Sequence, residues 1–356
     1  MPTVRRVRPV VAAAAQPTLG DVARLAEVSV ATASRVLSPG NREPRPALRV
    51  RVLAAAERLN YTPNANARAI ARGGSDIVGL IVSDLSDPYF STIAAGAIRV
   101  ADEHGVLTTL ADTRRDPRRE IDYLSALRRQ RARGVIVVGS RMRDEALHAA
   151  FARELAAYRS TDGRVSVISQ PRLDADTIAV SNRAGARALA IELCRLGYRR
   201  FAVLAGPADL ITATDRLAGF KAGLTKCGVE LPRSHVIHGE FTRDGAYAAA
   251  LRLLADGPAV DCIFAVNDVM AVGVIAAARQ AGVKMPDDVG VAGFDDILTL
   301  RDVVPALTTV RIPLYDIGVE AMRRVLDLTT TPGVRRVAGS VVLRDSTARI
   351  PNVGSF

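Results

Sequence analysis

The segment Ser29–Ser38 reads SVATASRVLS and combines a single large cation, Arg35, with small polar side chains. An ordinary solvent-facing helix carries Glu and Lys on its outer face, whereas this segment has no acidic residue. Small residues such as Ala31, Thr32 and Ser34 let a helix backbone approach the base edges of a DNA major groove, which is about 12 Å wide. Arg35 is long enough to reach a guanine or a phosphate. The pattern favours a DNA-reading helix over a solvated bundle helix.

The flanking residues predict the helices that would hold this segment. Apolar residues recur at helical spacing before and after it, and Pro46 suits the first turn of a third helix over 46–59. Glu27-Val28-Ser29 forms the predicted turn, with Ser29 able to cap the second helix. Together these features predict a three-helix, helix-turn-helix arrangement whose second helix stays exposed. The predicted core positions are Leu19, Val22, Ala23, Ala26, Val30, Ala33, Leu37, Leu48, Val52, Ala55, Ala56 and Leu59.

The connector 61–76, YTPNANARAIARGGSD, carries Arg68 and Arg72 around an isolated Ile70. It is too short to form a stable helix alone in water. A helix that orders only on DNA can lie in the minor groove and insert Ile70 between base steps. The alternative is an ordinary linker.

Charge is concentrated at one end of the chain. The formal net charge is +11, of which residues 1–75 carry +8 and the remaining 281 residues only +3. A basic head on a nearly neutral body indicates a polyanion partner for the head. Residues 1–17 imitate a secretory signal, but the apolar stretch VVAAAA is too short, so we expect a disordered leader or an over-long start site. Cys194, Cys227 and Cys262 lack metal or disulfide spacing and fit a reducing cytoplasm.

From Ile77 onward, short apolar runs alternate with amphipathic stretches. Runs such as IVGLIV, VLTTL, GVIVVG, VSVIS, FAVLAG, CIFAV and VGVAGF are typical of buried parallel strands, and helical patterns cover 91–103, 117–129, 183–196, 214–227 and 267–280. This alternation predicts a doubly wound α/β body in two halves. Ligands of such sheets bind at the carboxyl ends of the strands. The segments there, SDLSDPYF, SQPRLDAD, GPADLITATD, NDVM and FDDILT, predict a cleft for a polar small molecule.

Two other functions are alternatives. An enzyme can use the same fold, but the chain has no nucleophile elbow, P-loop or dinucleotide fingerprint. His235 and His238 lie in an expected strand, where their spacing points them to opposite faces, so we predict no metal site, and no cofactor. A secreted solute-binding protein needs an export signal and no DNA-binding head. No apolar run is long enough to span a bilayer.

Several motifs, in order, resemble the lactose-repressor (LacI) family. They are TLGDVARLAEVSVATASRVLS, RVLAAAERLNYTPNANARAIARG, IVGLIVSDLSDPYF, GPADLITATDRLAGF, FAVNDVMAVGVIAAARQAG, VAGFDDI, PALTTVRIPLYDIGVEA and VVLRDSTAR. The resemblance covers about residues 18–349 and implies a cytoplasmic, nucleoid-associated dimeric repressor. It also implies a core like periplasmic sugar-binding proteins, in which two subdomains with three crossovers clasp a small effector. Because the tail lacks a heptad helix, we expect a dimer and a pseudo-palindromic double-stranded DNA operator.

The expected organisation follows the resemblance. It is a leader (1–17), an all-α helix-turn-helix head (18–62), a hinge helix or linker (63–75), an α/β core of two doubly wound parallel sheets (76–350) and a tail (351–356). The N-subdomain should span about 76–178 and 306–336, and the C-subdomain about 179–305 and 337–350.

The resemblance also implies the DNA contacts. In the head these are Thr18, Leu19, Ser29, Val30, Ala31, Thr32, Ser34 and Arg35, with Val30 and Ala31 at the main specificity positions. In the hinge they are Asn64, Ala67, Arg68, Ile70 and Ala71. The chain departs from the family in having Ile70 in place of a leucine wedge, Asn66 in place of an apolar residue, and Glu27 at a turn position that favours glycine.

For the effector, the expected cleft residues are Tyr89, Phe90, Ser169, Leu210, Thr212, Thr214, Phe241, Asn267, Asp268 and Asp295. Asp295 can accept two hydrogen bonds from vicinal hydroxyls or a base edge. For Asp268 and Asp296, capping a helix is the alternative role. Leu210 and Thr214 stand where some members have an arginine, and Ser169-Gln170 replaces a common acidic residue. A less charged cleft favours a neutral sugar or polyol over a phosphorylated or purine ligand. Effector binding would then change the subdomain angle and order or melt the hinges.

Overall fold

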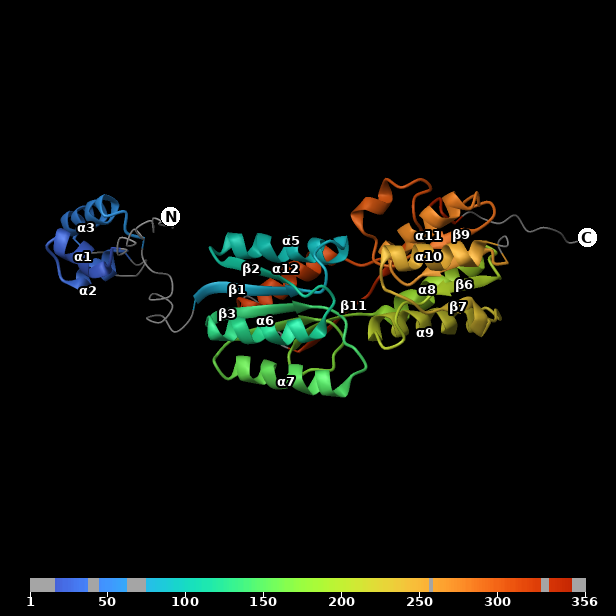
Figure 1. The fold of residues 1–356 in the computed structure, drawn as a ribbon, viewed down its shortest axis with the longest axis horizontal. Helices are drawn as coiled ribbons and strands as arrows, with labels where there is room; N and C mark the ends of the chain where they lie inside the picture. Colours follow the sequence, from blue (N-terminus) through green and yellow to red (C-terminus); the bar gives the residue numbers. More distant parts are fainter. Residues whose placement is uncertain (1–16, 38–44, 63–74, 256–258, 328–332, 348–356) are drawn as a thin grey trace, which may run out of the picture. The chain divides into compact units, whose positions relative to one another are not determined.

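The computed structural model describes residues 17–37, 45–62, 75–255, 259–327 and 333–347. The chain divides into two compact units, Met1–Ser75 and Asp76–Phe356 (Figure 1). The expected leader and tail, and the hinge residues Asn64, Ala67, Arg68, Ile70 and Ala71, lie outside the described residues. Within the described ranges, no helix is long and apolar enough to cross a membrane.

The first unit is a three-helix bundle around a small core. Its helices are α1 (Leu19–Leu25), α2 (Val30–Leu37) and α3 (Pro46–Arg58). The buried residues are mostly alanine and valine, which allows the helices to approach closely. The prediction for Val30 is wrong, since its side chain is 52% exposed and Val36 packs against the core instead. The core residues are Val22, Ala23, Ala26, Ala33, Val52, Ala55 and Ala56, with Leu19, Val28, Val36, Leu37, Leu59 and Tyr61 packed against them.

The second unit begins with a six-stranded sheet in the order β11-β5-β4-β3-β1-β2. The pairs β1–β2, β3–β4, β4–β5 and β5–β11 are parallel. Helices α5 and α12 cover one face and α6 and α7 the other (Figure 1), each face with its own apolar contacts. The elements are β1 (Ser75–Val82), α5 (Pro88–Glu103), β2 (Leu107–Asp112), α6 (Pro117–Arg129), β3 (Ala132–Val138), α7 (Glu145–Arg159), β4 (Arg164–Ile168), β5 (Asp176–Val180), α12 (Leu314–Val325) and β11 (Val334–Val337).

A second, four-stranded sheet in the order β7-β6-β8-β9 is entirely parallel. Helices α8 and α9 pack together, as do α10 and α11. The elements are α8 (Asn182–Arg195), β6 (Phe201–Leu204), α9 (Ile211–Lys226), β7 (Val236–Ile237), α10 (Arg243–Leu254), β8 (Cys262–Ala265), α11 (Asp268–Gln280) and β9 (Gly290–Ala292), with the 3-10 turns η1 (Arg233–His235) and η2 (Leu298–Arg301). A small antiparallel pair, β10 (Thr309–Arg311) and β12 (Ser340–Val342), completes this half.

The chain crosses between the two halves three times, once later than expected. The N-subdomain was predicted to resume at 306, but β10 still belongs to the C-subdomain. It pairs with β12, and the bridges Ala292↔Thr308 and Asp295↔Arg311 attach this stretch to the end of β9. The chain reaches the N-subdomain only at α12. The other crossovers lie between β5 and α8 and between β11 and β12.

A strand forms at VLTTL as predicted, but it is not buried. β2 forms there, but at the edge of the sheet, and the side chain of Leu107 is 65% exposed. An edge strand lacks a neighbour on one side, so its apolar residues are not all covered.

Candidate functional sites

The turn between α1 and α2 is fixed by short polar contacts. Thr18 and Asp21 form a capping box at the start of α1, with the Thr18 N–H donating to Asp21 Oδ2 at 2.9 Å. The Thr32 N–H donates to Ser29 Oγ at 3.2 Å, so Ser29 caps α2 as predicted. Glu27 has φ 49°, the left-handed conformation that favours glycine. Arg51 of α3 donates to the Ala26 carbonyl at 2.6 Å and holds this turn against the bundle.

Helix α2 presents a face of small residues and one cation. Val30, Ala31 and Arg35 are exposed, and Thr32 and Ser34 are half-buried. The Arg35 Nε donates to the Ala31 carbonyl at 3.2 Å, which keeps its guanidinium along the helix. Thr18 and Ser29 are also exposed, and Leu19 is half-buried. These residues can approach a nucleic-acid groove without displacing the core.

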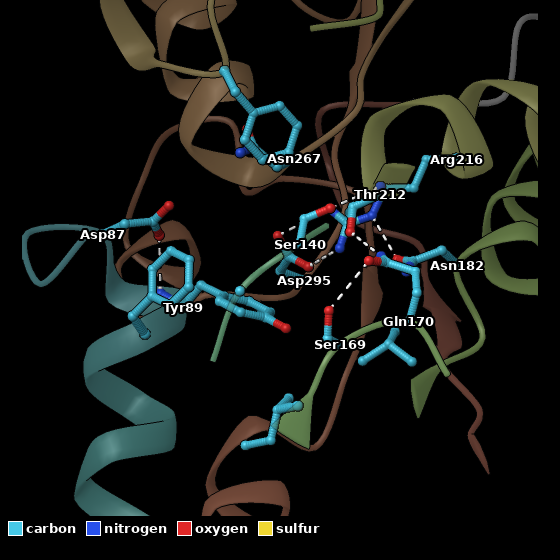
Figure 2. Close-up of a pocket in the computed structure, with 15 residues that line it drawn as sticks. Asp87, Tyr89, Ser140, Ser169, Gln170, Asn182, Thr212, Arg216, Asn267 and Asp295 are labelled. Atoms are coloured by element: carbon cyan, nitrogen blue, oxygen red, sulfur yellow. Dashed lines mark hydrogen bonds and ion pairs between the residues drawn. The ribbon is translucent and has the colours of Figure 1, made fainter. Parts of the chain in front are cut away.

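A cleft of about 540 Å³, a volume that includes space open to solvent, lies where strand ends of the two sheets of the second unit meet. Aromatic side chains and hydrogen-bonding groups both point into it (Figure 2). Seven of the expected effector residues line it, namely Tyr89, Phe90, Ser169, Thr212, Phe241, Asn267 and Asp295. It is also lined by Asp87, Gly139, Ser140, Ile168, Gln170, Val180, Asn182 and Arg216.

A buried ion pair forms one wall of the cleft. Arg216 donates to Asp295 Oδ1 at 2.7 Å and to Oδ2 at 3.2 Å, and its Nε donates to Asn182 Oδ1 at 2.8 Å. The Arg216 guanidinium stacks on Phe294, 3.9 Å from the ring centroid. Burial raises the pKa of Asp295, and the Arg216 guanidinium opposes this rise. The two short contacts pair the Arg216 cation with the Asp295 carboxyl inside the wall.

The opposite wall carries a second paired carboxylate. Asp87 caps α5 through Tyr89 N and accepts from Arg115 Nη2 at 3.2 Å. Burial raises the pKa of Asp87, with the Tyr89 N–H and Arg115 opposing it. Arg115 also lies 5.9 Å from the ring centroid of Phe241, which comes from the other subdomain. Burial likewise raises the pKa of the Tyr89 hydroxyl.

Three expected effector residues do not line the cleft. Leu210 immediately precedes α9, and Thr214 bonds back to the Ile211 carbonyl and to Arg143. Asp268 is fully buried, accepting from Thr309 Oγ1 at 2.7 Å and from Ile297 N at 3.0 Å. The capping role suspected for Asp268 belongs to its neighbour, because Asn267 Oδ1 accepts from Met270 N. Asp296 pairs with Arg311 and Arg344.

Sequence reasoning missed Arg216, although the motif containing it was recognised. Arg216 lies four residues after Thr212 on α9, a spacing that puts both on one helix face. Asn182 was missed because it follows β5, which was not recognised as a strand. The cleft therefore contains an arginine, contrary to the expectation from Leu210 and Thr214, but its charge is paired.

The expected strand position of His235 and His238 is wrong, because His235 ends the 3-10 turn η1 and His238 follows the two-residue strand β7. His235 bonds to the Phe201 carbonyl and His238 to the Gly206 carbonyl. Across the described ranges, no group of three or more His, Cys, Asp or Glu is placed to hold a metal ion.

Comparison with known sequences matches both units. Residues 18–64 match the profile of bacterial regulatory proteins of the lacI family. Residues 75–339 match that of periplasmic binding proteins and the sugar-binding domain of the LacI family. The transcriptional repressor CytR of Escherichia coli is 30% identical over 339 residues, covering 94% of this chain and 97% of that protein. The regulator GalR of Escherichia coli is 32% identical over 343 residues, covering 94% and 97%. These relatives are regulators, so the enzyme alternative has no support.

Solved structures give the same result. A lac repressor dimer bound to operator and an anti-inducer matches with a TM-score of 0.79 and 26% identity over 93% of this chain and 99% of that one. A complex of the regulator CelR with cellobiose matches with a TM-score of 0.65 and 29% identity, covering 93% and 99%. With both sequence profiles and both structural units in agreement, the chain belongs to the LacI family of DNA-binding transcriptional regulators.

Proposed function

We propose that the chain represses transcription as a homodimer whose operator affinity is set by a small, neutral, polyhydroxylated effector, a sugar or a related metabolite. The observation that carries the effector class is the cleft itself, where aromatic faces and hydrogen-bonding groups converge on one cavity while its charges are paired internally. A neutral ligand with hydroxyl groups fits this surface, whereas an anionic ligand would need an unpaired cation.

Individual side chains have assignable tasks. Phe241 and Phe90 supply faces for the apolar side of a sugar ring. Asn267 uses its oxygen to cap α11, so its amide nitrogen is the group left to donate to a ligand. Asp295 has lone pairs beyond those that Arg216 occupies, and these can accept from a hydroxyl. Similarity to the cellobiose complex of CelR supports a carbohydrate.

For DNA, α2 is the proposed major-groove element, with Thr18, Leu19, Ser29, Val30, Ala31, Thr32, Ser34 and Arg35 as its contacts. The hinge residues Asn64, Ala67, Arg68, Ile70 and Ala71 are proposed for the minor groove. Two copies related by two-fold symmetry would read a pseudo-palindromic operator. The dimer is supported by similarity to the operator-bound lac repressor dimer. A protein that acts on an operator would work in the cytoplasm, at the nucleoid.

The test has a DNA arm and a ligand arm. The purified chain is used to select duplexes from a random pool, and its affinity for the selected duplex is compared with a scrambled one. Arg35→Ala should weaken specific binding by about tenfold, roughly the low to middle range for a base contact, with an unchanged melting temperature. Arg58→Ala, on the exposed end of α3, is the matched control. Failure to enrich any duplex would remove the repressor role.

In the ligand arm, thermal shift is measured with a panel of neutral sugars and nucleosides, including D-ribose, D-galactose and cellobiose. A true effector raises the melting temperature in a concentration-dependent way and changes affinity for the selected duplex. Stabilisation by sugar phosphates, without stabilisation by any neutral compound, would overturn the proposed effector class.

A further inference from the structure

Helix α9 lacks a cap from its own side chains. The N-cap residue of α5, α6, α7, α10 and α11 is Asp, Thr or Asn, and in each case its side chain accepts a backbone N–H of the first turn. The N-cap residues of α3, α8 and α12 make no such bond, and the N-cap of α9 is Leu210, which has no acceptor in its side chain. Unpaired amides at a helix start must find acceptors elsewhere.

Those acceptors come from the other subdomain. The Ile211 N–H donates to the Arg141 carbonyl at 3.0 Å, and the Thr212 N–H donates to Ser140 Oγ at 3.0 Å. Arg143 N donates to the Asp209 carbonyl at 2.9 Å, which completes an antiparallel bridge. We call this contact, between Ser140–Arg143 and Asp209–Thr212, the cross-cleft cap.

The cross-cleft cap includes side chains that face the ligand cavity. Gln170 Nε2 donates to Thr212 Oγ1 at 2.8 Å, while Gln170 Oε1 accepts from Arg141 N at 2.8 Å. Figure 2 shows Ser140, Gln170 and Thr212 joined along one side of the cleft, with Arg216 following Thr212 on α9. A ligand that touches this wall therefore touches the contact itself.

On the N-subdomain side, buried contacts of Arg141 hold the cross-cleft cap in place. The Arg141 guanidinium donates to both oxygens of Glu120 of α6, at 2.7 and 2.9 Å, and lies 4.7 Å from the ring centroid of Phe151. Both charged side chains are buried. Because this side is fixed to the N-subdomain and Asp209–Thr212 lead into α9 of the C-subdomain, the cross-cleft hydrogen bonds depend on the subdomain angle.

We propose that the cross-cleft cap is the element that holds the two subdomains at the angle seen here, and that effectors act on operator affinity by strengthening or breaking it. Its regulatory role rests on the proposed function, but its existence as a breakable contact does not. The contact consists of a few hydrogen bonds near solvent, and each can be exchanged for water at small net cost. Helix α9 then couples Arg216, in the ligand wall, to the subdomain angle.

One substitution removes a single donor of the cap. Ile211→Pro deletes the N–H that bonds to Arg141, at the first helical position, where proline is well tolerated. Leu210 has φ −81° and ψ 114°, a conformation compatible with a following proline. Ile211→Ala is the matched control, because it loses the side chain but keeps the donor.

Hydrogen exchange of the full-length protein tests the contact without a ligand. In Ile211→Pro, peptides covering 140–144 and 212–214 should exchange about threefold to tenfold faster than in Ile211→Ala, the effect of one lost hydrogen bond. Peptides from β3 and β6 should not change. Equal exchange in the two variants, or a rise that extends equally into β3 and β6, would overturn the proposal.

A disulfide provides the opposite perturbation. Met142 and Leu210 face each other in a pair flanked by hydrogen bonds, a geometry with Cα atoms about 4.5 Å apart and suited to a disulfide. In Met142→Cys/Leu210→Cys, oxidised glutathione should lock the cap, and reductant returns the same protein to its unlocked form. Each single cysteine variant controls for the native thiols.

Operator affinity is then compared between the locked protein and Ile211→Pro. The two should differ at least tenfold for the duplex selected above, while reduced double-cysteine protein and Ile211→Ala agree with the unmodified chain. The regulatory role would be contradicted if the operator affinities of the disulfide-locked protein and of Ile211→Pro lie within twofold of each other. If no duplex is selected, the proposed function fails, and the exchange experiment still decides whether the cap opens.

Discussion

At the residue scale, Asp268 comes directly after Asn267, a residue that lines the cleft. The Asp268 carboxylate nevertheless accepts hydrogen bonds only from other groups of the protein. Its oxygens accept from Thr309 Oγ1 and Ile297 N, which ties α11 to the loop after β9 and to β10. No cation contacts it among the described residues, so burial dominates and raises its pKa to about 6.

This pKa has a consequence for stability. The carboxyl binds its proton more tightly in the folded than in the unfolded protein, where its pKa is 3.8. Its contribution to the free energy of unfolding is therefore complete below about pH 4 and is lost as the pH rises through about 6. In Asp268→Asn the amide can accept from Ile297 N and donate to the Thr309 hydroxyl, so the variant keeps both bonds without a titrating group.

Relative to Asp268→Asn, the unmodified chain should lose about 2 kcal/mol of unfolding free energy between pH 4 and 7. Urea unfolding followed by circular dichroism measures this, since the chain has no tryptophan. Parallel pH profiles of the two proteins would refute the assignment. A variant whose stability falls with rising pH more steeply than the unmodified chain would refute it as well.

The adjacent residues Asp295 and Asp296 pair with different arginines in different parts of the core. Both have positive φ, 123° and 58°, which is unusual for a residue with a Cβ. Asp295 pairs with Arg216 in the cleft, whereas Asp296 pairs with Arg311 and Arg344 beside two crossovers. Burial opposes ionisation of Asp296, but hydrogen bonds from these arginines hold its pKa below the usual range. The ligand wall and the crossovers are thus joined by one peptide bond.

At the scale of elements, the turn between α1 and α2 stores local strain. Glu27 has φ 49° and pairs with Arg51 at 3.1 Å, but both side chains are largely exposed and the pair is worth little. Glu27→Gly removes the clash of the Cβ with the backbone, whereas Glu27→Ala keeps it. Both variants lose the ion pair.

The glycine variant should therefore be more stable than the alanine variant by about 1 kcal/mol in the unfolding free energy of the head. Thermal unfolding by circular dichroism compares the two directly. Equal stabilities would mean that the turn relaxes when the Glu27 side chain is lost.

The elements that sequence could predict were those with long, regular periodicity. α6 begins and ends at the predicted residues, and α8 and α11 lie within one residue of prediction. α9 was started at 214 rather than at Ile211, so residues 210–214 were treated as a loop and their faces were not assigned. This explains why Leu210 and Thr214 were expected in the cleft, although they are not among its lining residues, and why Arg216 was missed. β10 and β12 have three residues each and exist only through pairing between distant segments, which leaves no local pattern.

The cross-cleft cap was unpredictable for a related reason. Its donors and acceptors are mainly backbone groups of two loops about 70 residues apart, and backbone groups leave no mark on the sequence. The only local sign is Leu210, an N-cap residue without an acceptor. A helix start whose N-cap residue has no acceptor can take one from another part of the fold.

At the scale of the whole molecule, the net positive charge lies mainly in the DNA-binding part of the chain and not in the effector-binding core. Residues 1–75 carry a net +8, all of the positive charge as arginine, while the rest of the chain carries +3. The cleft pairs its charges internally, through Arg216 with Asp295 and Arg115 with Asp87. Salt should therefore act strongly on DNA binding and weakly on binding of a neutral effector.

Operator affinity should fall about a thousandfold or more between 50 and 200 mM salt if two heads neutralise six or more phosphates. The slope of log affinity against log salt measures the number of phosphates neutralised. Arg35→Ala separates two roles of this residue on the same plot. If Arg35 contacts a phosphate, the salt slope of Arg35→Ala becomes shallower by about one per head, and affinity falls equally for all duplexes. If Arg35 reads a base, the salt slope is unchanged and discrimination against the scrambled duplex is lost. Since α2 has no acidic residue and Arg35 is its one cation, we expect the second outcome. A shallower salt slope without loss of discrimination would instead assign sequence reading to the small residues around Arg35.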